Sequence, residues 1–144
     1  MKWKWTPSIA YACVILAFTS VPGDYLLVPE PFDISDKWVH AALYLPLGAL
    51  AFGALSRGHR PLSLWRRSFY TLIVCAAFAA LDECHQLFIP GRFGDVLDWL
   101  ADTIGVAAGT GLSLACIHWR RPVEPEAEEV EVVLDATAAP DRHD

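Results

Sequence analysis

Acidic, histidine and amide side chains interrupt a very apolar chain near the ends of its long hydrophobic stretches. The candidates for chemistry are Asp36, His40, Asp82, Glu83, His85, Gln86, Arg92, Asp95, Asp98 and Asp102. Carboxylates beside an imidazole can act as general acid and base. The guanidinium of Arg92 can hold a phosphate or carboxylate through paired hydrogen bonds. Gln86 is the only side-chain amide in the chain, which favours a fixed hydrogen-bonding role beside the carboxylates.

The charges of this set do not balance, because six acids face only two bases, Lys37 and Arg92. Crowded carboxylates in a low dielectric cannot all ionise without compensation. The acids can pair with Arg92 and a protonated His40 or His85, or some can keep a proton, as a general acid does. They can also bind a cation together with the histidines. No HExxH or comparable spacing occurs, so we predict no dedicated metal site and no cofactor.

Regular spacing gathers several of these residues onto helix faces. Asp36, His40 and Tyr44 recur every four residues and share one stripe, although capping a helix start would equally explain Asp36. Asp82 and Gln86 are likewise four residues apart. The spacing therefore predicts one polar stripe on each of two helices.

The strongest pattern is Asp98, Asp102, Gly105 and Gly109, at spacings of four, three and four along one face. Gly105 and Gly109 form a GxxxG, which lets another helix approach closely. The two carboxylates therefore point into a helix bundle and not toward lipid. The glycine face is open to two uses, a homo-oligomer or a contact within the chain.

Long apolar runs must position these residues, and they cover 5–21, 38–56, 69–88 and 96–119. A bilayer core of roughly 30 Å needs about 20 helical residues. We predict an all-α membrane protein, an antiparallel bundle of four transmembrane helices within residues 1–121. A soluble bundle would need polar helix faces, which these runs lack. The first run could instead be a cleaved signal peptide, with Lys2 and Lys4 as its positive region.

The basic residues predict an orientation in the membrane. One side would carry Lys2, Lys4, Arg57, Arg60, Arg66, Arg67, Arg120 and Arg121. The connections 22–37 and 89–95 carry only Lys37 and Arg92. The positive-inside rule then puts both termini in the cytoplasm and the polar residues at the extracytoplasmic interface.

The net charge of −6 belongs to the C-terminal segment 122–144, which holds eight of the 17 acids. Its Pro-, Glu- and Ala-rich composition predicts a disordered cytoplasmic tail. Residues 1–121 are near neutral, so no basic face exists for nucleic acid. The four cysteines contain no CxxC and predict neither a zinc ribbon nor a redox motif.

Three blocks resemble the VanZ-like family. The segment 36–40 is similar to its D-K-x-x-H opening, 82–92 to its D-E-x-x-Q-x-F-x-P-x-R block, and 95–109 to its final block. The resemblance implies a small multi-pass protein of the bacterial cytoplasmic (inner) membrane and cell envelope. Founding members are linked to resistance to glycopeptide antibiotics, especially teicoplanin. Asp102 departs from the family's usual Asn, so an amide role there does not carry over.

Two functions fit these residues best. The first is binding of an envelope lipid or a glycopeptide-related ligand, with Asp36, Asp82, His85, Gln86, Arg92, Asp95 and Asp102 as the binding residues. The alternative is a membrane-embedded hydrolase or transferase for a lipid-linked envelope precursor, with Glu83, Asp98 and His40 in acid–base roles. A purely structural network is a third reading. A transport path is not supported, because the acids do not continue to the cytoplasmic side.

Overall fold

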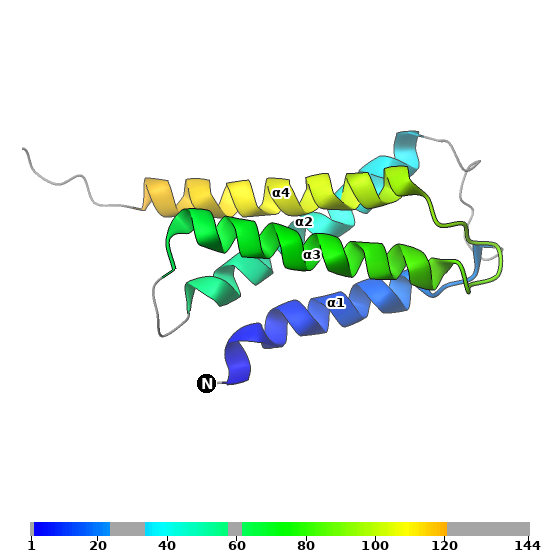
Figure 1. Cartoon of the computed structure of the whole chain (residues 1–144), viewed down its shortest axis with the longest axis horizontal. Coiled ribbons are helices and arrows are strands. Elements are labelled where there is room, and N and C mark those ends of the chain that lie inside the picture. Colours follow the sequence, from blue (N-terminus) through cyan, green and yellow to red (C-terminus); the bar gives the residue numbers. More distant parts are fainter. Residues whose placement is uncertain (1, 24–33, 58–61, 121–144) are drawn as a thin grey trace, which may run out of the picture.

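The computed structural model describes residues 2–23, 34–57 and 62–120, and in these ranges the chain is helical without any strand. A 3₁₀ turn, η1 (Lys2–Trp5), leads into α1 (Thr6–Thr19). The longer helices are α2 (Ile34–Ser56), α3 (Leu64–Gln86) and α4 (Val96–Trp119), and the four lie side by side along one long axis (Figure 1). The predicted tail 122–144 lies outside the described residues, as do Arg60 and Arg121.

Within the described residues, three helices are long and apolar enough to cross a membrane: α2 over Asp36–Ser56, α3 and α4. The predicted fourth span over 5–21 is not confirmed at α1, which has 14 residues. At about 1.5 Å per residue it extends roughly 21 Å, less than the hydrocarbon core. Pro7 starts this helix after the 3₁₀ turn and Ser20 closes it, so the apolar run 5–21 overstates its length.

Helix boundaries follow capping as well as hydropathy. The third helix begins at Leu64, not at the predicted residue 69, because the Ser63 hydroxyl accepts a hydrogen bond from the Arg66 backbone N–H. The last helix has the predicted bounds 96–119, with Asp95 capping its first turn. The second begins at Ile34, four residues earlier than predicted, since Asp36 and Lys37 are tolerated in a first helical turn.

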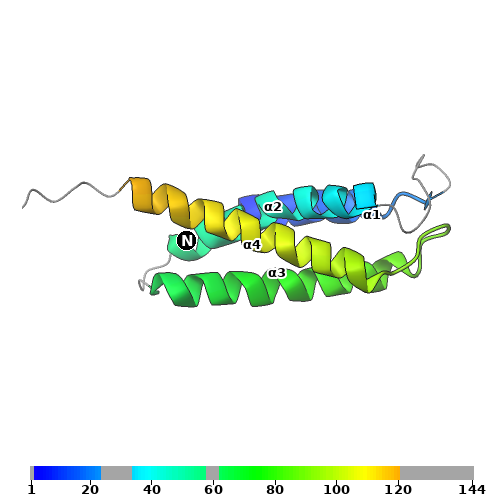
Figure 2. The same ribbon diagram turned by 90° about the horizontal axis from the view of Figure 1, so that it is seen from above.

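The closest packing joins α2 to α4, and glycines make it possible. Gly105 lies against the backbone of Ala41 and Gly109 against that of Leu45; a Cβ added at either glycine would overlap the facing carbonyl oxygen. Gly48 on α2 lies equally close to α4. The GxxxG face is therefore occupied by α2 within the chain. Figure 2 shows α4 running obliquely across α2, with its first turns close to the end of α3.

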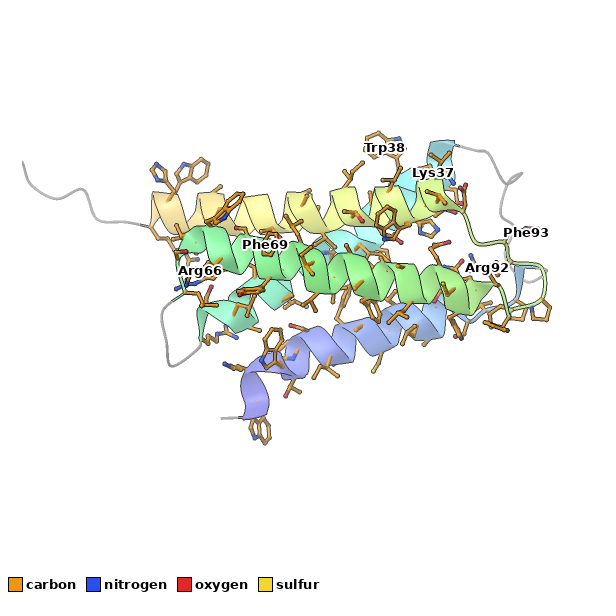
Figure 3. All side chains as sticks on the ribbon, in the orientation of Figure 1. Lys37, Trp38, Arg66, Phe69, Arg92 and Phe93 are labelled. Carbon is orange, nitrogen blue, oxygen red and sulfur yellow. The ribbon has the colours of Figure 1, made fainter. Side chains whose placement is uncertain are left out.

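Large apolar side chains cover the outside of the bundle instead of filling its centre. Trp38, Trp65, Leu81 and Ile104 are exposed, and many others project outward in Figure 3. The buried centre is small and includes Tyr44. An exposed apolar surface of this extent is typical of a lipid-facing protein.

The contacts of Asp95 at the start of α4 can be tested by substitution. Asp95 accepts a hydrogen bond from the Leu97 N–H at 2.9 Å and forms an ion pair with Lys37. The hydrogen bond from Lys37 and, next, that from the Leu97 N–H hold the pKa of the Asp95 carboxyl below its usual range. A carboxyl group whose pKa is lowered by folding stabilises the protein at pH values above its ordinary pKa. This stability is lost as the pH falls through the lowered pKa. Asp95→Ala should cost about 1 kcal/mol, measured by thermal unfolding in detergent. Asp95→Asn should cost less, because asparagine still caps; equal losses in both variants would contradict the capping role.

Candidate functional site

The predicted polar residues gather at one end of the bundle, where α2 and α4 begin and α3 ends (Figures 1 and 3). The most deeply buried are His40, Asp82, Glu83, Gln86, Asp98 and Asp102. The others, Asp36, His85, Arg92 and Asp95, are only partly buried. Residues from three helices, up to 66 positions apart, thus share one region of the molecule.

His40 and Asp102 connect α2 to α4 inside this region. The His40 Nδ1 lies 3.0 Å from Asp102 Oδ1, and the His40 Nε2 lies 4.0 Å from Asp98 Oδ2. Asp102 is fully buried, and its Oδ2 has no hydrogen-bond partner among the described residues. The close approach of α2 and α4 at their glycines brings these side chains together.

Lys37 supplies a positive charge to this region. Its Nζ donates to Asp95 Oδ2 at 2.9 Å and forms a second, closer ion pair with Asp98 Oδ1. Lys37 was predicted only as a base that offsets the acids, and not as a residue of the site. The signal was available, since Lys37 follows Asp36 in the D-K-x-x-H block and lies almost one helical turn before His40.

Glu83 joins the end of α3 to the start of α4. Its Oε2 accepts a hydrogen bond from the Asp95 backbone N–H at 2.9 Å, and its Oε1 faces Gln86 Nε2 at 3.4 Å. The only side-chain amide of the chain thus contacts a carboxylate, as the sequence suggested. These two donors fix the orientation of the Glu83 carboxylate.

Asp82 makes its hydrogen bonds toward α1 and α2. Its Oδ1 accepts from the Thr19 hydroxyl at 2.7 Å and its Oδ2 from the Tyr44 hydroxyl at 2.9 Å. These bonds tie α1 and α2 to α3 through a carboxylate that is 1% exposed. Thr19 and Tyr44 were not predicted as partners, because nothing in the local spacing relates them to Asp82.

A matched pair of tyrosines tests this network. Tyr44→Phe removes the donor to Asp82 Oδ2 and should cost about 1–3 kcal/mol of stability. Tyr70→Phe changes an exposed tyrosine on α3 and should cost much less. Thermal unfolding of both variants in the same detergent checks the difference, and equal unfolding temperatures would contradict a structural role for the Tyr44–Asp82 bond.

Arg92 and His85 lie toward the connection between α3 and α4. Arg92 Nε donates to the Val21 carbonyl at 3.3 Å, which holds this connection against the end of α1. Gly91, at φ 72°, makes the turn just before it. Buried nitrogens of both side chains, Arg92 Nη2 and His85 Nδ1, have no partner in the described part of the chain. They are available to an anionic or accepting group of a ligand.

In the part of the chain that the structure describes, two overlapping triads bring possible ligand atoms within 4.8 Å of one another. One is His40 with Glu83 and Asp102, and all three are buried. The other is His40 with Asp36 and Asp98, of which Asp36 is only partly buried. An imidazole with several carboxylates can exchange protons with a bound molecule or coordinate a cation.

Comparison with known proteins identifies the family. The VanZ/LLP1 family model matches residues 8–117, a range that runs from the first turn of α1 almost to the end of α4. No curated protein matches the chain. No solved structure matches it either. The matched region includes every residue of the polar end described above, and the chain therefore belongs to the VanZ/LLP1 family.

Proposed function

We propose that this protein resides in the bacterial cytoplasmic membrane, with both termini in the cytoplasm and its polar end facing outward. The support is the distribution of basic residues. Arg57, Arg66, Arg67 and Arg120 are at the end of the bundle opposite to the polar site. The positive-inside rule assigns that end to the cytoplasm. In this proposal α1 lies in the membrane as a fourth helix, with Trp3 and Trp5 at the inner interface.

The function that this geometry supports best is binding of an envelope lipid head group, a lipid-linked envelope precursor or a glycopeptide-related ligand. The observation that carries the proposal is the convergence of His40, Glu83, Asp98 and Asp102 at a single end of the bundle, all buried. Buried charged groups in a membrane protein are costly, so they favour a functional role. Arg92 would hold a phosphate or carboxylate, and the carboxylates would accept from hydroxyl or amino groups.

Lipid binding can be measured directly on the purified full-length protein. Native mass spectrometry with a bacterial lipid extract should detect a retained head-group species. Asp98→Asn and Arg92→Ala should each weaken its retention about tenfold or more, as expected when a charged hydrogen bond is lost. Arg66→Ala, a matched change at the opposite end, should have no effect. Unchanged retention in both site variants at normal protein levels would refute the binding proposal.

The family resemblance suggests a cellular readout for the same variants. Expression in a teicoplanin-susceptible bacterium should lower susceptibility, and Glu83→Gln should abolish the effect while the protein stays in the membrane. Membrane levels must be measured alongside, because a loss in level would favour a purely structural role for Glu83.

An enzymatic role is the second candidate, favoured by the His40–Asp102 contact at 3.0 Å. A carboxylate that orients an imidazole in this way prepares it to accept a proton from water or a substrate hydroxyl. Incubation of the purified protein with a lipid extract, followed by mass spectrometry of the products, distinguishes the two functions. Turnover that is lost in His40→Ala supports hydrolysis or transfer, and the absence of any product supports binding alone.

A further inference from the structure

The proposed function does not explain how the buried carboxylate of Asp102 is stabilised. This carboxylate is fully buried, one oxygen contacts His40, and Oδ2 has no partner among the described residues. An unpaired carboxylate oxygen in a low dielectric is costly unless a proton or a cation satisfies it. The Lys37 ammonium group is already engaged by Asp95 and Asp98.

The surroundings of Asp102 supply the donors that a metal ion needs. His40 from α2, Glu83 from α3 and Asp102 from α4 each offer a ligand atom, and these atoms all lie within 4.8 Å of one another. With metal–ligand distances of about 2.0–2.2 Å, two ligands of one tetrahedral ion lie roughly 3.3 Å apart. The His40–Asp102 separation of 3.0 Å is close to that value. A Glu83 oxygen lies within the same 4.8 Å.

We infer that His40, Glu83 and Asp102 form a binding site for a divalent transition-metal ion of the Zn²⁺ type. Imidazole favours zinc over calcium and magnesium, and carboxylates complete the donor set. Three protein ligands leave a fourth position of a tetrahedral ion open to water or to a ligand oxygen. The expectation of no dedicated metal site rested on local spacing, which cannot detect ligands contributed by three separate helices.

The outer triad of Asp36, His40 and Asp98 is a weaker candidate. Asp98 is already neutralised by Lys37, whose ammonium group would repel a cation bound beside it. Asp36 is only partly buried and therefore has access to water. His40 belongs to both triads, so a single ion is expected.

Groups that contact the ligands are arranged as metal sites require. The Asp95 backbone N–H and Gln86 hold the two oxygens of Glu83, and hydrogen bonds to ligating carboxylates fix their direction toward an ion. Asp98 lies beside the second nitrogen of His40. A metal site would thus explain why Gln86 lies beside Glu83 and Asp98 beside His40.

Metal analysis of the full-length protein tests the inference. Protein purified in detergent without a histidine tag is stripped with EDTA and titrated with Zn²⁺, and the bound metal is counted by mass spectrometry. We expect about one Zn²⁺ per chain, and a loss of affinity of about tenfold or more in Asp102→Asn, which keeps the shape of the side chain. Asp36→Asn distinguishes the two triads and should keep wild-type affinity if the inner triad holds the ion. His118→Ala, which removes an exposed imidazole near the opposite end of α4, is the matched control and should bind as the wild type does.

X-ray absorption of the zinc complex adds an independent signature. Nitrogen and oxygen ligands should appear at about 2.0–2.1 Å, with no sulfur at about 2.3 Å. Sulfur ligation would assign the ion to cysteines and overturn the inference. So would the absence of saturable Zn²⁺ binding, or a loss in Asp36→Asn with none in Asp102→Asn. Unfolding of the stripped variants, followed by tryptophan fluorescence, shows whether each is folded.

The metal site stands independently of the proposed lipid binding. Lipid retention is measured on the same samples with and without Zn²⁺. Zinc binding without lipid retention would uphold the metal site and refute the proposed ligand. Lipid retention without zinc binding would uphold the proposed ligand and refute the metal site.

Discussion

Replacement of Gly105 by alanine is expected to destabilise the protein by about 2–3 kcal/mol, although it adds only one methyl group. The new Cβ would overlap the carbonyl oxygen of Ala41, and backbone atoms cannot rotate away as a side chain does. The two helices must separate instead. Gly109→Ala should behave alike, because its Cβ would overlap the Leu45 carbonyl.

A third glycine of the same helix provides the control. Gly111 has no atom within 4 Å of an added Cβ among the described residues, so Gly111→Ala should be neutral or slightly stabilising through its better helix propensity. Unfolding temperatures of the three variants in one detergent make the comparison. Equal values for Gly105→Ala and Gly111→Ala would contradict the close α2–α4 contact.

The same substitution should also disturb the candidate site. His40 immediately precedes Ala41, and Asp102 lies one turn before Gly105. Any separation of the helices at Gly105 therefore moves the imidazole away from the carboxylate. Gly105→Ala should lose Zn²⁺ and lipid binding, whereas Gly111→Ala should retain both.

His40→Ala is the second change with a large expected effect. It leaves the buried Asp102 without its described partner, and removal of one member of a buried charged pair costs about 3–5 kcal/mol. The loss should be recovered in large part by a second change, Asp102→Asn, because a neutral amide is less costly to bury. His118→Ala, at the exposed end of α4, is the matched control and should have little effect.

A double-mutant cycle on metal-free protein measures this interaction. The free energies of unfolding of the wild type, both single variants and the double variant give the coupling between the two side chains. A coupling above about 1 kcal/mol supports the buried contact. Strictly additive effects would mean that His40 and Asp102 do not interact.

The sequence predicted those features that local spacing determines. Long apolar runs identified α2, α3 and α4, and the last of these has the predicted bounds 96–119. The stripe of Asp98, Asp102, Gly105 and Gly109 pointed into the bundle, because helical periodicity relates these positions directly. The family resemblance is confirmed by the match over residues 8–117.

Features that depend on tertiary contact could not be predicted. The hydroxyls of Thr19 and Tyr44 reach Asp82 from two other helices. The length of α1 depends on where its helical hydrogen bonds stop, and hydropathy alone does not report that. Lys37 bridges two acids on α4 only because the helices cross near Ala41. The contacts of Thr19, Tyr44 and Lys37 join different elements, and spacing within one element does not reveal them.

The central claim is that side chains from three helices form one buried polar site at a single end of the bundle. A density map of the full-length protein in a lipid nanodisc, resolved to side chains, tests it most directly. The account predicts His40 within hydrogen-bonding or metal-bridged distance of Asp102, with Glu83 beside them and away from lipid. Density with His40 or Glu83 directed into the acyl chains, or with the two at opposite membrane faces, would contradict it.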